Sequence, residues 1–489
     1  MYISKSKYCN GVQCKKMLWL DKYCYDEKGE VDNQSILDNG ADVGILAKDL
    51  FGDYIDIEFN QDLSKMIKDT LSVIENNDYA NITEASFCYK DNFCSVDILR
   101  KINDSYEIYE VKSSTEIKDI YLDDISYQYY VLNNLGYKIS KASIVYINNK
   151  YIRHGKLELD KLFNLENVTD IVLEKQKEVE KNIQEINEYM TQENEPNDDI
   201  GIHCIKPYEC PFFKYCTRNL PSNNIFNIRR IRNSTKFDLY HNGIYFYENL
   251  LKENIDSKAK EQIEFELYDK EDKVNKEKIR EFIETLYYPL YFLDFETFQQ
   301  SIPQYEDIKP YEQIPFQYSL HYIESEDSPL EHKEFLSEPD IDPRRKLAES
   351  LVKDIPKDVC VLAYNMSFEK TVIKNLAELY PDLKEHLLNI RDNIKDLMIP
   401  FYNRDYYTKD MYGSYSIKYV LPALFKDDEK LNYHNLEEVH NGSEAMNAFA
   451  NMGKLLTKDR EKLRHNLLKY CELDTYAMVK IWKKLKDIK

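Results

Sequence analysis

The chain has 489 residues, of which 43% are hydrophobic and 31% charged, and its net charge is −21. This length and composition are typical of a folded protein with several domains and exclude a disordered chain. The acidic balance excludes a protein that coats nucleic acid by bulk electrostatics, because such binding depends on Lys and Arg side chains that neutralise phosphates. Any contact with phosphate must therefore be local.

The first residues lack the pattern of a signal peptide, and no apolar run is long enough to span a bilayer. We therefore expect a cytoplasmic protein that does not act at a membrane. Ten cysteines in a reducing compartment are not expected to form a disulfide framework. Clustered cysteines are first candidates for metal ligands, and scattered ones are candidates for the core.

The pattern of elements divides the chain into three parts and predicts an α/β multidomain protein. Residues 1–218 mix strands and helices, and residues 219–286 are highly charged and helical, which predicts a connector. From residue 287 to residue 489, short apolar strands alternate with helices, as is typical of an α/β domain.

The first part contains a candidate acidic site on a hairpin. The stretches "ASFCYKDNFCSVDILRKI" and "SYEIYEVKSS" alternate like two paired strands, with a turn at Asn103 and Asp104. Glu110 and Lys112 lie on one face of the second strand, and pairing would bring Asp97 beside them. Two acids and a lysine are a nuclease arrangement, in which the acids hold Mg²⁺ or Mn²⁺ and the ammonium positions water and phosphate. The alternative is a salt bridge across the strands.

The cysteine pattern predicts a metal centre at the end of the first part. Cys204, Cys210 and Cys216 are evenly spaced, and Cys14 lies far upstream. The paired Cys-x-x-Cys knuckles of a zinc ribbon are absent from this stretch. Four thiolates can instead bind a [4Fe-4S] cluster.

Together, the hairpin and the cysteines resemble the RecB-like PD-(D/E)xK exonucleases with an iron-sulfur cluster, known among CRISPR-associated proteins and helicase-nucleases. The resemblance covers residues 1–218 and implies a restriction-endonuclease-like α/β domain. It also implies that Asp97, Glu110 and Lys112 are catalytic, that the two acids bind the metal ion, and that one upstream and three downstream cysteines hold the cluster: Cys14, Cys204, Cys210 and Cys216. Cys9 is the alternative to Cys14.

The sequence departs from that family at two positions. Lys48 stands near the place where the family often has a metal-binding histidine, and Leu132 follows Gln128 at the place where a tyrosine is expected. Glu84, on the strand before Asp97, is an alternative ligand or an exposed side chain.

A basic stretch follows the cysteines. From Lys214 to Lys236 the sequence contains no acid but four arginines, namely Arg218, Arg229, Arg230 and Arg232. This stretch is either a local phosphate-binding patch or the solvated face of a helix.

The stretch "YFLDFETF", residues 291–298, predicts the main site of the third part. A buried strand ends by placing Asp294 and Glu296 on one face. Such carboxylates repel each other unless a cation lies between them, which favours a divalent metal site. Glu369, at the start of a helix after the strand "VCVLAY", and Asp474, on the last helix, are expected to join it. Tyr470 precedes Asp474 by one helical turn.

These residues and their order resemble the DEDD superfamily of DnaQ-like, RNase T-like 3′-to-5′ exonucleases over residues 287–489. The resemblance implies an RNase H-like α/β domain in which four acids hold two Mg²⁺ or Mn²⁺ ions: Asp294, Glu296, Glu369 and Asp474. Tyr470 would orient the attacking water or help to deprotonate it. Glu369 stands where the family usually has aspartate.

With the stretches "GSYSIKYVLPALF" and "YHNLEEVHNGSEA", both halves resemble an uncharacterised family that fuses the two nuclease-like domains. The resemblance implies a 3′-to-5′ exonuclease acting on single-stranded DNA or RNA, with a second nuclease site in the N-terminal domain. A helicase or another nucleic-acid-processing protein is a candidate partner. Two alternatives stay open, namely a nucleic-acid clamp with inactive sites and a zinc-stapled scaffold for protein partners.

Overall fold

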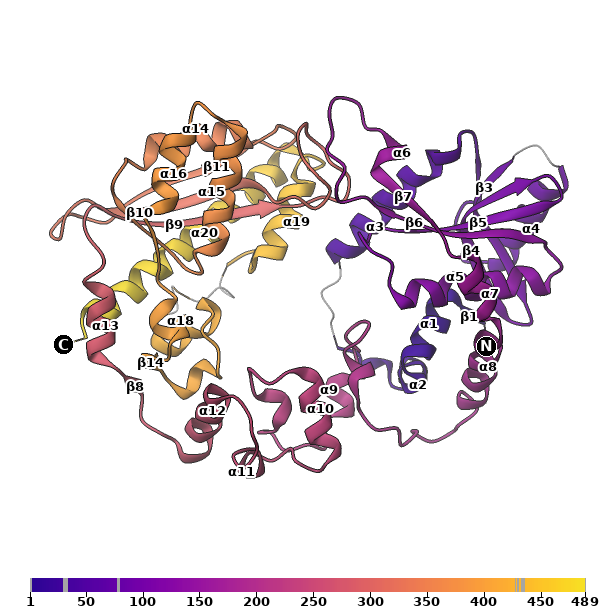
Figure 1. Ribbon diagram of the computed structural model, residues 1–489, viewed down its shortest axis with the longest axis horizontal. Helices are drawn as coiled ribbons and strands as arrows, with labels where there is room; N and C mark the ends of the chain where they lie inside the picture. Colours follow the sequence, from indigo (N-terminus) through magenta and orange to yellow (C-terminus); the bar gives the residue numbers. More distant parts are fainter. Residues whose placement is uncertain are drawn as a thin grey trace. The chain divides into compact units, whose positions relative to one another are not determined.

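The computed structural model describes residues 2–29, 34–76, 80–426, 428, 431 and 436–488. Residues 433–435, at the start of the stretch "YHNLEEVHNGSEA", lie outside these ranges. The chain forms two compact units, unit 1 with Met1–Leu220 and Gln300–Glu312, and unit 2 with Pro221–Gln299 and Gln313–Lys489 (Figure 1). Both units mix helices with a sheet, so the α/β multidomain prediction is confirmed. Among the described residues, no helix has the length and apolar character needed to cross a membrane.

Unit 1 is built on a seven-stranded sheet with the order β2-β3-β4-β5-β6-β7, in which β1 also pairs with β4. The strands are β1 Ile3–Ser4, β2 Ile55–Asp56, β3 Asn81–Tyr89, β4 Asn92–Ile102, β5 Ser105–Lys112, β6 Ile139–Ile147 and β7 Phe163–Asn167. The helices are α1 Lys5–Gln13, α2 Lys15–Tyr23, α3 Gln34–Ala47, α4 Leu63–Asn76, α5 Asp119–Asn134, α6 Leu159–Leu162, α7 Thr169–Glu174, α8 Gln176–Tyr189 and α9 Phe213–Cys216. Short 3₁₀ turns η1 Tyr25–Glu27, η2 Lys48–Phe51 and η3 Ile202–Cys204 complete it.

The predicted hairpin of unit 1 is confirmed in part. β4 and β5 are antiparallel and turn at Asn103 and Asp104. The stretch before that turn, expected as one strand, forms two, because the chain also turns at Lys90 and Asp91, which have φ values of +44° and +66°. The sheet therefore gains one more antiparallel strand than the sequence predicted.

Unit 2 contains a five-stranded sheet with the order β11-β10-β9-β12-β13 and a separate pair, β14 with β8. The strands are β8 Lys273–Val274, β9 Leu290–Phe298, β10 Ile314–Ile323, β11 Glu331–Leu336, β12 Cys360–Ala363, β13 Ile394–Asp396 and β14 Tyr406–Tyr407. The helices are α10 Asn233–His241, α11 Tyr247–Leu250, α12 Ser257–Tyr268, α13 Lys276–Ile283, α14 Arg344–Asp354, α15 Ser367–Leu379, α16 Lys384–Asp392, α17 Ile399–Tyr402, α18 Ile417–Leu424, α19 Gly442–Met452 and α20 Thr457–Lys486. The 3₁₀ turns are η4 Ile225–Asn227 and η5 Lys409–Met411.

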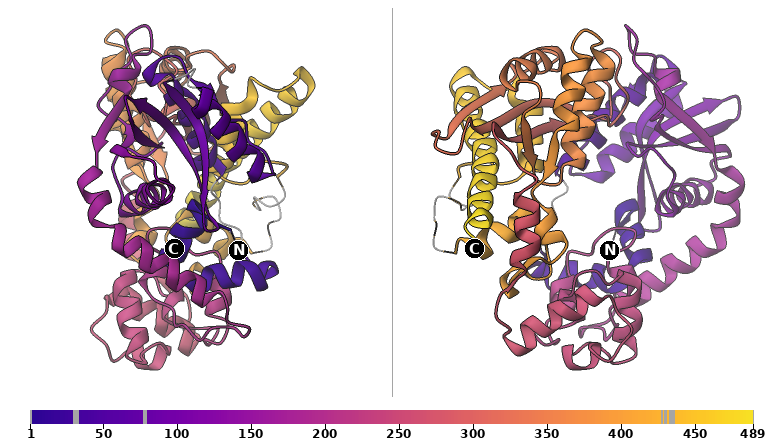
Figure 2. Two further views of the ribbon diagram at one scale, coloured as in Figure 1. Left: turned by 90° about the vertical axis from the view of Figure 1, so that its right-hand side faces the viewer. Right: turned by 60° about the vertical axis from the view of Figure 1, so that its left-hand side comes forward.

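Helices cover both faces of the five-stranded sheet (Figure 2). Tyr291 and Leu293 of β9 pack in one core with residues of α14, α15 and α16. Leu290 and Phe292 face the other way and pack in a second core with α20. This alternation follows from the period of two along a strand, and it decides which helix the acids at the end of β9 face.

The segment predicted as a connector, residues 219–286, contributes to the second core of unit 2. Phe265 of α12 and Ile279 of α13 are buried in the same cluster as Leu290 and Phe292. The charged residues of this segment lie on its outside, while its apolar residues pack against the C-terminal half.

The packing predicts that Phe292→Ala destabilises unit 2 by about 3–5 kcal/mol, because Phe292 is fully buried and contacts Trp482 with ring centroids 5.7 Å apart. The chain has two tryptophans, so urea unfolding of unit 2 is followed by Trp482 fluorescence in a Trp19→Phe background. Leu456→Ala, at a residue that is 79% exposed, is the control and should change stability by less than about 0.5 kcal/mol. Equal effects of the two substitutions would contradict the assigned core.

Candidate functional site

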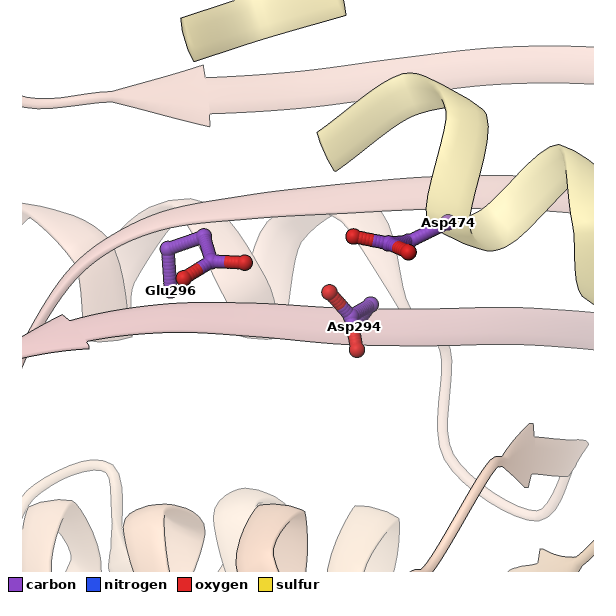
Figure 3. Close-up of side chains that lie close together, drawn as sticks. All are labelled: Asp294, Glu296 and Asp474. Carbon is purple, nitrogen blue, oxygen red and sulfur yellow. The ribbon is translucent and has the colours of Figure 1, made fainter. Parts of the chain in front are cut away.

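Three carboxylates meet where β9 faces α20. Asp294 and Glu296 continue the row of β9 side chains that begins with Leu290 and Phe292, and Asp474 comes from α20 (Figure 3). Ligand oxygens of these three acids all lie within 4.8 Å of one another. The structure thus brings together three of the four acids predicted for this site.

Buried hydrogen bonds hold α20 in the position that this meeting requires. Thr475, next to Asp474, contacts Ser319 Oγ at 2.7 Å and His321 Nδ1 at 2.8 Å through its hydroxyl. Nearer the start of α20, the carbonyl of Leu467 accepts a hydrogen bond from the Gln317 side chain at 2.8 Å. All three partners lie on β10, the neighbour of β9, so these hydrogen bonds fix the position of α20 along the sheet.

The three acids destabilise one another's charged forms. Burial raises the pKa of Asp294 well above its usual range, and the charges of Asp474 and Glu296 raise it further. Burial and Asp474 also raise the pKa of Glu296, while Lys418 of α18 opposes this shift. A divalent cation would relieve both the repulsion and the desolvation.

Glu369 lies near the three carboxylates but outside their 4.8 Å group. It is 2% exposed, and its Oε2 atom has no hydrogen-bond partner among the described residues. Burial raises its pKa to about 8. Its charge also raises the pKa values of Asp294 and Glu296, so it faces the same site from α15. A carboxylate that binds a metal ion has an oxygen without a hydrogen-bond partner when the ion is absent, and the buried Oε2 atom of Glu369 is such an oxygen.

A capped turn positions Glu369. Asp396 accepts hydrogen bonds from the backbone N–H groups of Asn365 at 3.0 Å and Met366 at 3.3 Å, just before α15 begins. Asn365 has φ +70°, a left-handed conformation that asparagine tolerates better than most residues. Tyr470, the remaining predicted residue, is buried on α20 one turn before Asp474.

The N-terminal acids also meet, but around lysines. Lys112 Nζ lies 2.6 Å from Glu110 Oε1, and Lys5 Nζ lies 3.0 Å from Asp97 Oδ1 and 3.1 Å from Glu110 Oε1. The pairing of Ile98 with Tyr109 places Asp97 opposite Glu110, as the hairpin predicted. All three predicted residues are therefore in one cluster, which is an ion-pair network.

The sequence did not predict two members of this network, Lys5 and Asp124, and it did not connect a third, Gln128, with the acids. Lys112 also pairs with Asp124 at 2.7 Å, and Gln128 donates to Glu110 at 2.6 Å and to Asp124 at 3.0 Å. Asp124 and Gln128 are four residues apart on α5, a spacing that could have linked them. Lys5 gives no such signal, because it arrives through the pairing of β1 with β4.

Glu84 lies at an irregularity of β3. It has φ +56°, and the pairing of β3 with β4 passes from Thr83 directly to Ala85. Burial raises its pKa to about 7, and the charge of Asp97 contributes in the same direction. Glu84 is therefore near the N-terminal acids and partly buried, which is compatible with the alternative ligand role. Lys48, at the place of the family's histidine, pairs with Asp56 at 2.6 Å.

Four cysteines of unit 1 lie within electrostatic range of one another. Burial raises the pKa of Cys204 to about 12, with further contributions from Cys14, Cys210 and Cys216. Gln13, next to Cys14, holds the loop of Cys204 by donating to the carbonyls of His203 at 2.8 Å and Tyr208 at 2.7 Å. Cys14, Cys204, Cys210 and Cys216 therefore lie in one region of unit 1.

Cys9 lies elsewhere, because its thiol contacts the carbonyl of Ile120 and interacts with Asp124 and Lys112. Cys14 is the cysteine that joins the other three. Among the described residues, no three of the four sulfur atoms lie within 4.8 Å of one another. Sulfurs bound tetrahedrally to one zinc ion would be about 3.8 Å apart, since Zn–S bonds are about 2.3 Å long.

Comparison with known proteins gives one match. Residues 291–416 match a family model described as a domain of unknown function, DUF2779. The match includes Asp294, Glu296 and Glu369 and ends before α18 and α20. No curated protein and no solved structure matches the chain.

The site predicts opposite effects of Asp294→Asn with and without metal. In metal-free protein at pH 8, the substitution should raise the melting temperature of unit 2 by several degrees, at about 2–4 °C per kcal/mol, because one of the mutually repelling charges is removed. With Mn²⁺ at about 100 times its dissociation constant, wild type should gain about 2.7 kcal/mol and the variant little. Trp482 fluorescence reports the transition in the Trp19→Phe background.

The metal-free gain should shrink between pH 8 and pH 5. A raised carboxyl pKa means that the folded state binds more protons than the unfolded state, so stability is lost as pH rises through the raised pKa and restored as it falls. Asp327→Asn, at an exposed turn of unit 2, is the matched control and should show neither effect. Destabilisation of the metal-free protein by Asp294→Asn would contradict the electrostatic account.

Proposed function

We propose that the chain is a metal-dependent nuclease whose unit 2 removes nucleotides from the 3′ ends of single-stranded DNA or RNA. The observation that carries the proposal is the meeting of half-buried Asp294, buried Glu296 and half-buried Asp474, whose ligand oxygens lie within 4.8 Å of one another. Strand, helix and capped turn together present four carboxylates to one place, in the order expected for a DEDD exonuclease with an RNase H-like fold.

The donor set fits Mg²⁺ or Mn²⁺. These ions prefer carboxylate oxygens, and two oxygens on opposite sides of one Mg²⁺ are about 4.2 Å apart, because each Mg–O bond is about 2.1 Å long. The 4.8 Å envelope of the three acids is compatible with this separation. Glu369, with its unpartnered Oε2 atom, would supply the fourth carboxylate.

When bound, a pair of divalent ions supplies positive charge to the scissile phosphate and lowers the pKa of the attacking water. The chain's residues hold the reacting groups: the four carboxylates fix the site, and Tyr470 orients the water. The water oxygen forms a bond to phosphorus, the bond to the 3′ oxygen breaks, and that oxygen takes a proton. The longer Glu369 side chain reaches from α15 to the position that aspartate usually fills.

For unit 1 we propose a RecB-like PD-(D/E)xK domain whose acidic site contributes nucleic-acid binding more than cleavage. The ammonium group of Lys5 bridges Asp97 and Glu110, the two acids expected to hold the metal ion. A metal ion at this place would have to displace Lys5, so the site is already neutralised from within the chain. This arrangement favours the clamp alternative for unit 1.

We further propose that Cys14, Cys204, Cys210 and Cys216 hold a [4Fe-4S] cluster. Four thiols in one region of unit 1 are the ligand set that such a cluster takes, and the paired Cys-x-x-Cys knuckles of a zinc ribbon are absent from the stretch with Cys204, Cys210 and Cys216. Because Cys14 is joined to the rest of the domain through α1 and α2, the cluster would tie the two ends of unit 1 together.

The nuclease proposal predicts that purified chain with Mg²⁺ or Mn²⁺ shortens single-stranded oligonucleotides from the 3′ end. Asp294→Ala should reduce the rate at least about 100-fold, since even outer-shell partners of a metal cost 10–100-fold. Lys112→Ala should leave this activity unchanged. Shortening is measured on DNA and RNA labelled at either end. Full activity of Asp294→Ala would overturn the assignment, and loss of 3′ shortening in Lys112→Ala would place it in unit 1.

The cluster proposal predicts about four irons and four acid-labile sulfides per chain after anaerobic purification, with a brown colour. Cys14→Ser should lose most of both and Cys9→Ser should keep them, because Cys9 lies apart from the other cysteines. Colourless protein with one zinc per chain would contradict the proposal.

A further inference from the structure

Part of the predicted basic stretch forms a surface of unit 2 together with tyrosines distant in sequence. We name it the basic-aromatic surface, and it consists of Arg229, Arg230, Lys258, Tyr402, Tyr415 and Tyr419. Arg230 lies over the rings of Tyr402 and Tyr415 at 5.4 and 5.3 Å from their centroids. Arg229 lies 4.5 Å from the ring centroid of Tyr419. Four segments of the chain therefore bring cations and aromatic rings together.

The two arginines of this surface are open to solvent. Arg229 and Arg230 are exposed, and within the described ranges neither forms an ion pair with a carboxylate. Lys258 lies over Tyr402 at 4.7 Å, and its ammonium donates to a backbone carbonyl at 2.6 Å. Burial lowers the pKa of Lys258, Arg230 and Arg404 lower it further, and Asp256 and Glu261 act in the opposite direction.

The first part of the basic stretch belongs to unit 1 and does not join this surface. Arg218, in unit 1, pairs with Glu195 at 2.9 Å and stacks on Tyr215. Arg230, in contrast, keeps its exposed position at φ +62°, a conformation that costs a non-glycine residue about 1 kcal/mol or more. In a chain with net charge −21, exposed arginines that form no ion pair with a carboxylate create a local positive potential, which attracts an anionic partner.

Helix α18 carries one residue of the basic-aromatic surface and one that acts on the carboxylate site. Tyr419 of that helix lies under Arg229, and its neighbour Lys418 acts on the charge of Glu296. The turn η5 packs against both α12, which carries Lys258, and α18. The backbone carbonyl of Tyr412, just after η5, accepts from Arg229 Nε at 3.2 Å.

We propose that the basic-aromatic surface binds the single strand upstream of the 3′ end that enters the carboxylate site, an inference that rests on the proposed function. Arginine and lysine contact the phosphates, and bases stack on Tyr402 and Tyr415. Stacking on aromatic rings is tolerant of sequence and is worth about 1–3 kcal/mol per base. The surface therefore takes single-stranded nucleic acid of any sequence and disfavours duplex, whose bases are not free to stack.

Binding is tested apart from cleavage, in full-length protein carrying Asp294→Asn. The probes are fluorescein-labelled 20-mers of thymidylate and of uridylate and a blunt 20-base-pair duplex, followed by anisotropy. Arg229→Ala with Arg230→Ala should weaken single-strand binding at least tenfold and lower the slope of log affinity against log salt by about 1.4, or about 0.7 for each lost phosphate contact. Lys483→Ala with Lys484→Ala removes two adjacent exposed lysines of unit 2 as the matched control, and it should change little.

The stacking component is tested at Tyr402, which is 44% exposed. Tyr402→Ala should weaken binding at least fivefold, and Tyr402→Phe should keep it. Single strands with 5-iodouracil should cross-link to Tyr402 or Tyr415, which separates this surface from any binding by unit 1. Equal affinity of the arginine variant and the control, or cross-links confined to unit 1, would overturn the proposal. Equal affinity for single strand and duplex would also overturn the proposal, and so would a surface that binds a protein and not the strand.

These results are independent of the nuclease assay. If wild type cleaves but the arginine variant binds and cleaves normally, the surface proposal fails and the nuclease stands. If the Asp294→Asn protein binds through the surface and wild type cleaves nothing, the proposed function fails and the surface stands as a binding site.

Discussion

Mutual repulsion among buried carboxylates is the constraint on which unit 2 is built. Asp294 and Glu296 cannot leave the site, because their strand alternates between two helical layers. Asp474 cannot leave, because Thr475 beside it is bound to Ser319 and His321. The fold therefore holds like charges together, which lowers the stability of the metal-free protein. Such a loss is expected of the preorganised metal site that we propose.

The acidic clusters of the two units differ in whether lysines of the chain pair with them. In unit 1, Lys5 and Lys112 lie directly against Asp97, Glu110 and Asp124, so the network is neutralised by the chain itself. In unit 2, no lysine or arginine among the described residues forms an ion pair with Asp294 or Glu296. The second arrangement leaves the charge for an external cation, and for this reason we propose cleavage in unit 2 and binding in unit 1.

Local rules predicted the parts of the sites that depend on one element. The period of two along β9 predicted that Asp294 and Glu296 share a face, and the spacing of four on α20 placed Tyr470 with Asp474. The cysteine spacing singled out Cys204, Cys210 and Cys216, and Cys14 lies within electrostatic range of all three, while the cluster itself stays a prediction. What could not be predicted depends on distant pairing: Lys5 reaches the acids only because β1 pairs with β4. The basic stretch likewise divides between the units, and the tyrosines that its arginines contact come from α17, from α18 and from the residues just before α18.

The most direct test of the account is the anomalous diffraction of crystals soaked in Mn²⁺. The account predicts Mn²⁺ peaks bound by oxygens of Asp294, Glu296 and Asp474, with Glu369 joining them, and loss of those peaks in Asp294→Asn. Strong Mn²⁺ peaks elsewhere in the chain, with none among these three carboxylates at saturating Mn²⁺, would contradict it.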